Sequence, residues 1–298
     1  MRYKTLDGFA AIRGDEPENA LAAIQKEYDE KLANGAVVFA VAGAKEKEVS
    51  CTPEMTVAEL VEKAGGPADG SAAKFVHIGL PLGKLVPAAA FDRKVLEFAA
   101  PAQTGSFELA VFGENDCAVD YMGKLTAELK EESCGRCVLC RMALQQLGWL
   151  FDDAVNGRGR SDDKKTILDV AEAMQLGAHC PFGKAAGALA ANFAEDFGTV
   201  LEEHTKKKIC SAGVCKKYMT VHILPSKCTG CGDCMDVCDE DAITGKSGYI
   251  HMIDELDCTN CGKCIEACEE EAIIVAGARK PKSPDKLTKV GRWKGKDY

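Results

Sequence analysis

The chain carries the run CTGCGDCMDVC at residues 228–238 and the run CTNCGKCIEAC at residues 258–268. Both runs follow the spacing Cys-x-x-Cys-x-x-Cys-x-x-x-Cys, and the flanking Asp241-Ala242-Ile243 returns as Glu271-Ala272-Ile273. Three close thiols with a fourth nearby suit a four-iron cubane. Zinc also binds Cys-x-x-Cys, but its sites usually pair two isolated knuckles, so a third, duplicated cysteine favours iron and sulfur. The repeat therefore predicts two [4Fe–4S] clusters in a domain over residues 220–276.

The spacing resembles that of bacterial two-cluster ferredoxins, in which the fourth cysteine of each run binds the other cluster. The resemblance implies one cluster on Cys228, Cys231, Cys234 and Cys268, and another on Cys258, Cys261, Cys264 and Cys238. Acidic residues surround both runs, and Asp239 and Glu269 stand where a proline commonly follows the fourth cysteine. If these acids face the clusters they lower the reduction potentials, whereas if they point outward they solvate a surface.

A third group of cysteines lies in the middle of the chain, in Cys134-Gly135-x-Cys137-x-x-Cys140-Arg141, with Cys180 further on. Three close thiols at a helix start, with a fourth from another helix end, can enclose one more cubane at the tip of a bundle. Gly135 and Gly183 allow the backbone to approach the sulfur atoms. We therefore expect a third [4Fe–4S] cluster on Cys134, Cys137, Cys140 and Cys180.

Periodicity predicts a multidomain α+β fold. A helical segment over residues 1–35 contains a helix that starts at Pro17 and stops at Asn34-Gly35. Strands and one short helix follow over residues 36–117, as in a small β-grasp-like domain. Four helical segments, 119–133, 141–156, 163–176 and 183–204, predict a four-helix bundle within residues 118–205. A linker over residues 206–219 leads to the two-cluster domain, and residues 277–298 form a basic tail.

Several motifs occur in the same order along the chain as in a known family, and the resemblance extends over roughly 260 residues. Glu132-Ser133-Cys134-Gly135-Arg136-Cys137, together with Cys180-Pro181-Phe182-Gly183, resembles the cluster motif of the flavin-bearing NADH-binding subunit of Complex I. It is closer still to the β subunit of electron-bifurcating and NAD(P)-linked [FeFe] hydrogenases. The resemblance implies that residues 36–117 are the soluble-ligand-binding β-grasp domain of that family, followed by the bundle and the two-cluster ferredoxin domain.

The flavin domain of that family should precede the β-grasp domain, where only 36 residues stand here. No G-x-G-x-x-G occurs, and Gly183-Lys184 lacks the spacing of a Walker loop. We therefore expect neither FMN nor NAD on this chain.

Four cysteines remain outside the three cluster sets. Cys117, Cys210 and Cys215, with His204, make a three-cysteine, one-histidine set suited to tetrahedral zinc, and the hydrogenase relatives look similar at these positions. The alternative is that all four are buried, inert side chains. Cys51 is expected in a core. The remaining histidines, including His77 and His251, are scattered and are interpreted as structural.

The net charge of −9 argues against a nucleic-acid surface. No apolar stretch is long enough to span a bilayer, and the amino terminus lacks a signal core, so we expect a cytoplasmic protein with reduced thiols. Eight Lys or Arg stand in residues 277–298, and we expect that tail to lie on an acidic partner surface.

These observations predict an iron–sulfur electron-transfer subunit of a multisubunit cytoplasmic oxidoreductase. It would relay electrons between ferredoxin, or a partner cluster, and a flavin or metal centre on another subunit. The expected setting is an electron-bifurcating NAD(P)H/ferredoxin, hydrogenase or formate dehydrogenase complex. The expected partners are a flavoprotein, a thioredoxin-like iron–sulfur subunit, or a hydrogenase or formate dehydrogenase catalytic chain. Two alternatives stay open: a single-chain flavin-dependent NADH dehydrogenase, and a scaffolding module whose clusters are structural.

Overall fold

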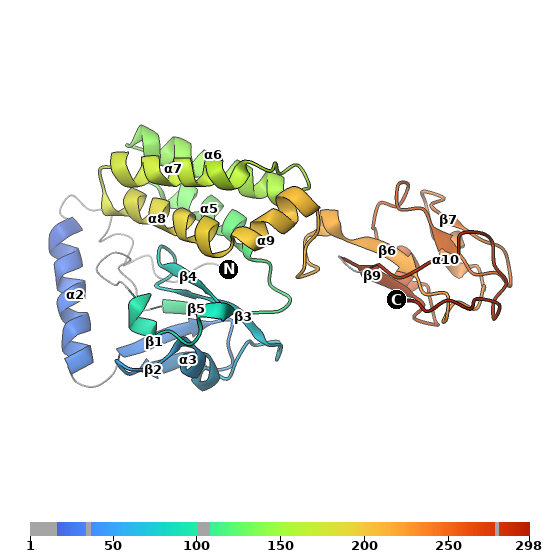
Figure 1. Ribbon diagram of the computed structural model, residues 1–298, viewed down its shortest axis with the longest axis horizontal. Helices are drawn as coiled ribbons and strands as arrows, with labels where there is room; N and C mark the ends of the chain where they lie inside the picture. The colour runs from blue at the N-terminus through green and yellow to red at the C-terminus, as the bar shows by residue number, and fades with distance from the viewer. Residues whose placement is uncertain (1–16, 34–36, 100–107, 278–279) are drawn as a thin grey trace. The chain divides into compact units, whose positions relative to one another are not determined.

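The computed structural model describes residues 17–33, 37–99, 108–277 and 280–298 (Figure 1). The chain divides between Lys207 and Lys208 into two compact units. Both α-helices and β-strands are present, so the predicted mixed α and β structure is confirmed. None of the described helices is long and apolar enough to cross a membrane.

Unit 1 contains a five-stranded mixed sheet in the order β2-β1-β5-β3-β4. Strand β1 runs parallel to β5, and the other neighbours are antiparallel. Strands were predicted over residues 36–117, and the described part of that range contains five. The bounds are β1 Val37–Ala42, β2 Glu48–Cys51, β3 Ala73–Ile78, β4 Lys84–Pro87 and β5 Glu108–Gly113.

Helices α2 (Pro17–Ala33) and α3 (Val57–Lys63) belong to this unit. The Thr56 hydroxyl accepts from the Glu59 amide, and the Glu59 carboxylate accepts from the Thr56 amide, which is the capping box that starts α3. Tyr28 of α2 is buried in the same core as Val57, and so is Cys51, as predicted. The predicted stop of α2 at Asn34-Gly35 lies outside the described residues.

Four helices cover one side of the sheet, with neighbours in sequence packed against each other (Figure 1). They are α5 Ala118–Glu132, α6 Val138–Val155, α7 Asp163–Gly177 and α8 Pro181–Asp196. The predicted fourth segment, 183–204, is interrupted at Phe197 and continues as α9 (Gly198–Glu202) and the π-helical turn η3 (Glu203–Lys207). The Phe197 ring stacks on Phe193 at 5.5 Å and meets Phe75 of the sheet edge-on at 5.7 Å. This packing accompanies the break, and a helical period alone does not reveal it.

Helix α8 also completes the hydrogen bonding of the edge strand β4. The Leu85 amide donates to Asn192 Oδ1 at 2.8 Å, and Asn192 Nδ2 donates to the Leu85 carbonyl at 3.2 Å. The side-chain amide therefore takes the place of a further strand at an otherwise unpaired edge.

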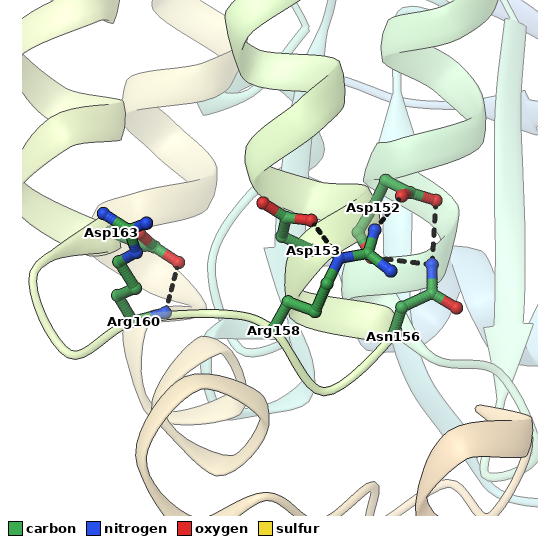
Figure 2. A network of polar contacts seen from close by, with 6 residues as sticks. All are labelled: Asp152, Asp153, Asn156, Arg158, Arg160 and Asp163. Atoms are coloured by element: carbon green, nitrogen blue, oxygen red, sulfur yellow. Dashed lines mark hydrogen bonds and ion pairs between the residues drawn. The ribbon is translucent and has the colours of Figure 1, made fainter.

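Ion pairs close the loop between α6 and α7 (Figure 2). Arg158 bridges Asp152 at 2.8 Å and Asp153 at 2.6 Å at the end of α6. The buried Asp163 carboxylate accepts from the Arg160 amide at 2.7 Å, and burial raises the pKa of Asp163. Because α6 and α7 form a hairpin, this loop and the start of α6 at Cys137 lie at opposite ends of the bundle.

Unit 2 repeats one small motif twice. Strand β6 (Thr220–Ile223) pairs with β9 (Ile273–Ala276), and β7 (Ile243–Thr244) pairs with β8 (Met252–Ile253), all antiparallel. Each cysteine run contributes one turn of helix, α10 (Asp233–Asp236) or α11 (Lys263–Glu266). A short 3₁₀ turn lies at Lys216–Tyr218 in this unit, and two more lie in unit 1, at Ala88–Ala90 and Val95–Glu97.

The described part of the basic tail packs on unit 2 itself. The Ile250 amide donates to the Thr288 carbonyl at 2.9 Å, and the Val290 amide donates to the Gly248 carbonyl at 3.1 Å. Lys280 forms an ion pair with Glu255. At these points the tail contacts its own chain, and the expected acidic partner surface stays a prediction.

Candidate iron–sulfur and zinc sites

The first candidate site lies where helices of unit 1 begin and end. Helix α6 starts directly after Cys137 and α8 directly after Cys180, so both cysteines occupy N-cap positions. Cys140 lies in the first turn of α6 and is buried. The positive end of a helix dipole favours thiolates and other anions. The two helix starts therefore suit an anionic cluster held by thiolates.

The four cysteines predicted for this cluster lie close together. Burial raises the pKa of Cys140, a contact of 3.8 Å with Ser133 Oγ opposes the rise, and the other three thiols add to it by repulsion. Such coupling requires neighbouring charges. The members of the group are Cys134, Cys137, Cys140 and Cys180.

Gly183 allows α8 to approach Cys140. A β-carbon on this residue would lie 2.6 Å from Ala178 Cβ and 3.5 Å from Cys140 Sγ. The first of these distances is impossible for real carbon atoms without a shift of the backbone. Gly183 is therefore required by the closeness of Ala178, whereas the 3.5 Å to Cys140 Sγ is an ordinary contact, so its expected role toward the sulfur atoms stays a prediction. Gly135 takes a positive φ of 71°.

In unit 2 each cysteine run shares its fourth member with the other run. Besides burial, the nearby thiols Cys228, Cys231 and Cys268 raise the pKa of Cys234. In the same way Cys258, Cys261 and Cys238 raise the pKa of Cys264. A cavity of about 120 Å³ is lined by Cys238, Cys258, Cys261 and Cys264, together with apolar side chains such as Ile243. A narrower cavity is lined by Cys228, Cys231, Cys234 and Cys268. Each cavity is thus lined by the three close cysteines of one run and the fourth cysteine of the other run.

All three donor sets consist of four thiols, with one buried thiol in each, and this composition fits a [4Fe–4S] cluster. Burial raises the pKa of Cys234 to about 12, and it raises the pKa of Cys264 too. These thiols are therefore protonated at neutral pH until iron binds them as thiolates, and that binding releases protons.

The acidic residues around the two runs are exposed, including Asp236, Asp239, Glu266 and Glu269. Asp239 forms an ion pair with Lys263. Water and counterions screen exposed charges, so this arrangement favours the view that the acids solvate the surface.

No role for His251 was predicted, yet it lies beside a cluster set. His251 is 2% exposed, and its Nδ1 lies 3.8 Å from Cys228 Sγ. Burial lowers the pKa of His251. The signal that identifies this residue is the internal repeat, which aligns His251 with Val221.

The predicted zinc ligands form two buried pairs, one in each unit. In unit 1, Cys117 Sγ lies 3.4 Å from His204 Nε2, and His204 Nδ1 lies 2.9 Å from the Val200 carbonyl. A carbonyl only accepts, so Nδ1 carries the proton and Nε2 presents its lone pair toward Cys117. In unit 2, Cys210 and Cys215 are buried, with Sγ atoms within 4.8 Å of each other.

Two segments of the chain match known protein families. Residues 120–204 match the NADH-ubiquinone oxidoreductase-F iron-sulfur binding region, and residues 207–273 match a 4Fe-4S dicluster domain. This is an iron–sulfur protein. Cys134, Cys137, Cys140 and Cys180 lie inside the iron–sulfur binding region, and both cysteine runs lie inside the dicluster domain.

The predicted family resemblance is confirmed by two curated relatives. The NADP-reducing hydrogenase subunit HndC of Solidesulfovibrio fructosivorans is 30% identical over 223 residues, which cover 73% of this chain and 46% of that protein. The F subunit of the NADH-quinone oxidoreductase of Mycobacterium tuberculosis is 29% identical over 136 residues, which cover 44% of this chain and 30% of that protein. The iron–sulfur protein therefore spans less than half the length of either relative.

Among solved structures, an NAD+-reducing [NiFe]-hydrogenase in the H2-reduced state is similar, with a TM-score of 0.49 and 23% sequence identity. The similarity covers 58% of this chain and 30% of that chain.

Proposed function

We propose that this chain is an electron-transfer subunit that holds three [4Fe–4S] clusters. The ligands would be Cys134, Cys137, Cys140 and Cys180 in the iron–sulfur binding region. In the dicluster domain they would be Cys228, Cys231, Cys234 and Cys268 for one cluster, and Cys258, Cys261, Cys264 and Cys238 for the other. When bound, such clusters each accept and release one electron.

The observation that supports this function most directly is the contact between the two crossed thiol sets. The pKa of Cys234 is raised by Cys264 of the other set as well as by its own set. Ile243 lines the cavity of one set and Ile273 that of the other, and both belong to the core that contains Cys234 and Cys264. These residues exclude water from the space between the sets and hold them side by side. Such an arrangement serves electron passage and has no evident use in substrate chemistry.

We propose that the partner of the bundle site is a separate chain that carries a flavin or a metal centre. The flavoprotein, the thioredoxin-like iron–sulfur subunit and the hydrogenase or formate dehydrogenase chain all remain candidates, in a cytoplasmic complex. Val138, Leu139 and Met142 are exposed in the first turns of α6, directly after Cys137. Leu176, 80% exposed, precedes Gly177, which contacts Leu139. Apolar side chains gathered beside a redox site are typical of a surface that another protein covers.

We further propose that Cys117, His204, Cys210 and Cys215 bind one zinc ion. The lone pair of His204 Nε2 and three buried thiols make a donor set that zinc prefers. The π-helical turn that carries His204 is a feature often found at functional sites.

We also propose a fold for each of the two domains in unit 1. We assign residues 36–117 to a β-grasp domain because α3 connects the hairpin β1–β2 to the other strands of the same sheet, in which β1 runs parallel to the central strand β5. We assign residues 118–205 to a four-helix bundle because α5 to α8 pack in sequence order.

The function is tested by electron exchange with ferredoxin. Protein purified without oxygen is reduced with dithionite, freed of reductant, and mixed with oxidised ferredoxin while both are followed by EPR. The expected result is oxidation of this chain as ferredoxin becomes reduced. In a second mixture, started from reduced ferredoxin and oxidised chain, electrons are expected to pass in the opposite direction if ferredoxin has the lower potential. Clusters that neither donate to nor accept from ferredoxin or viologens would support the structural role instead.

A further inference from the structure

The two halves of the dicluster domain correspond to each other through an offset of thirty residues. Ile223 pairs with Ile273 between β6 and β9, just as Ile253 pairs with Ile243 between β8 and β7. The next pairs, His222 with Ile274 and Met252 with Thr244, correspond in the same way. One step further, the pair Val221 and Val275 corresponds to His251 and Gly245.

The two corresponding pairs differ in chemistry although they occupy equivalent places. His251 lines the cavity of the set that contains Cys228, whereas Val221 lines the cavity of the set that contains Cys258. His251 Nδ1 lies 3.8 Å from Cys228 Sγ. The methyl groups of Val221 can donate no comparable hydrogen bond. The two cluster sites are therefore unequal at this position.

The absence of a side chain at Gly245 leaves room for the imidazole ring of His251. A β-carbon on Gly245 would lie 2.7 Å from Cγ and from Nε2 of His251. Any other residue at position 245 would displace the ring, because carbon atoms do not approach so closely without a shift. The equivalent of Gly245 in the other half is Val275, beside the smaller Val221. The half with the larger side chain, His251, therefore has the smaller residue, Gly245, opposite it, whereas the other half has Val221 and Val275.

The surroundings of His251 indicate which nitrogen carries the proton. A thiolate sulfur accepts hydrogen bonds and donates none, so a contact with Nδ1 requires a proton on Nδ1. His251 Nε2 is buried and has no hydrogen-bond partner among the described residues. A proton on Nε2 would leave a buried donor unsatisfied, whereas a proton on Nδ1 is satisfied by the sulfur.

We propose that His251 donates a hydrogen bond from Nδ1 to Cys228 Sγ and thereby makes the Cys228 site the more easily reduced of the two sites in the dicluster domain. The proposal rests on the iron–sulfur function proposed above. Reduction adds one electron from an external donor, and no bond forms or breaks. Part of the added negative charge resides on the ligating sulfur atoms, where an N–H donor stabilises it. Val221 gives the Cys258 site no such stabilisation, so an entering electron is directed to the Cys228 site.

The test is a redox titration of the full-length protein, followed by EPR, with both clusters of the dicluster domain loaded. In His251→Val, the higher of the two midpoint potentials is expected to fall toward the lower one. Loss of a hydrogen bond to a charged group corresponds to roughly a tenfold change in the reduction equilibrium, or about 59 mV for one electron. His222→Val is the matched control, because His222 is also buried but bonds to Thr220 at 2.6 Å. The control is expected to leave both potentials unchanged.

A reciprocal variant gives an independent test. Val221→His combined with Val275→Gly transfers the donor and its space to the other half, so the lower potential is expected to rise while the higher one stays. This variant decides the matter if His251→Val fails to load its cluster.

Potentials that stay fixed in both variants, in protein with both clusters present, would overturn the role of His251 and leave the electron-transfer function standing. Protein whose dicluster domain contains no iron would overturn both, and iron analysis distinguishes the two cases.

Discussion

His77 is the most deeply buried titratable side chain of the sheet. It is 0% exposed, its Nδ1 lies 2.7 Å from the Tyr121 hydroxyl, and burial lowers the pKa of His77 to about 3. The unfolded chain binds a proton at this residue near pH 6.5, and the folded chain does not. The contribution of His77 to stability is therefore complete above pH 6.5 and is lost progressively as the pH falls toward 3.

We predict that the free energy of unfolding falls by about 2 kcal/mol more between pH 7 and pH 5 in the natural protein than in His77→Gln. Denaturant unfolding at the two pH values measures the difference. Equal pH dependence in both proteins would show that His77 is not held in its neutral form by the fold.

Gly183 offers a second prediction about a single residue. In Gly183→Ala, the new methyl group meets Ala178 and pushes α8 away from Cys140, so we expect the iron content to fall by about a third and stability by about 1–3 kcal/mol. Gly148→Ala is the matched control on α6, because the nearest atom to its β-carbon is 4.0 Å away. The control should keep all its iron and gain up to about 1 kcal/mol. Full iron content in Gly183→Ala would contradict the predicted close approach.

At the level of elements, the cysteine motifs and most helices could be predicted because their signals are local in sequence. The capping box at Thr56 and the start of α2 at Pro17 are examples. The edge strand β4 and the break at Phe197 could not be predicted, because contacts distant in the sequence accompany both. Asn192 lies 107 residues from Leu85, and no spacing rule connects them. His251 differs, because the thirty-residue offset of the repeat already aligns it with Val221 in the sequence, although only the fold shows its contact with Cys228.

We predict that Asn192→Ala destabilises unit 1 by about 1–3 kcal/mol, because the Leu85 amide and carbonyl of β4 lose their partners. Gln25→Ala serves as the control. Gln25 bonds to Asp29 on an exposed face of α2, so its loss should change stability by less than about 0.5 kcal/mol. Denaturant unfolding compares the two, and equal stabilities would exclude a role for Asn192 in completing the edge of the sheet.

For the molecule as a whole, the zinc proposal predicts a defined metal content. We expect about one zinc per chain in the natural protein and almost none in His204→Ala, whose cluster EPR signals should persist. Limited proteolysis should then cut His204→Ala more readily near residues 206–219 than the natural protein. Natural protein that contains all its iron and no zinc would remove the proposal.

We propose that thiols between residues 134 and 268 hold three clusters and that the chain carries no organic redox cofactor. Analysis of iron, acid-labile sulfide and flavin in one anaerobic preparation tests this proposal. The expected result is about twelve irons and twelve sulfides per chain with no flavin. A content near eight irons, or a tightly bound flavin in the same preparation, would contradict the account.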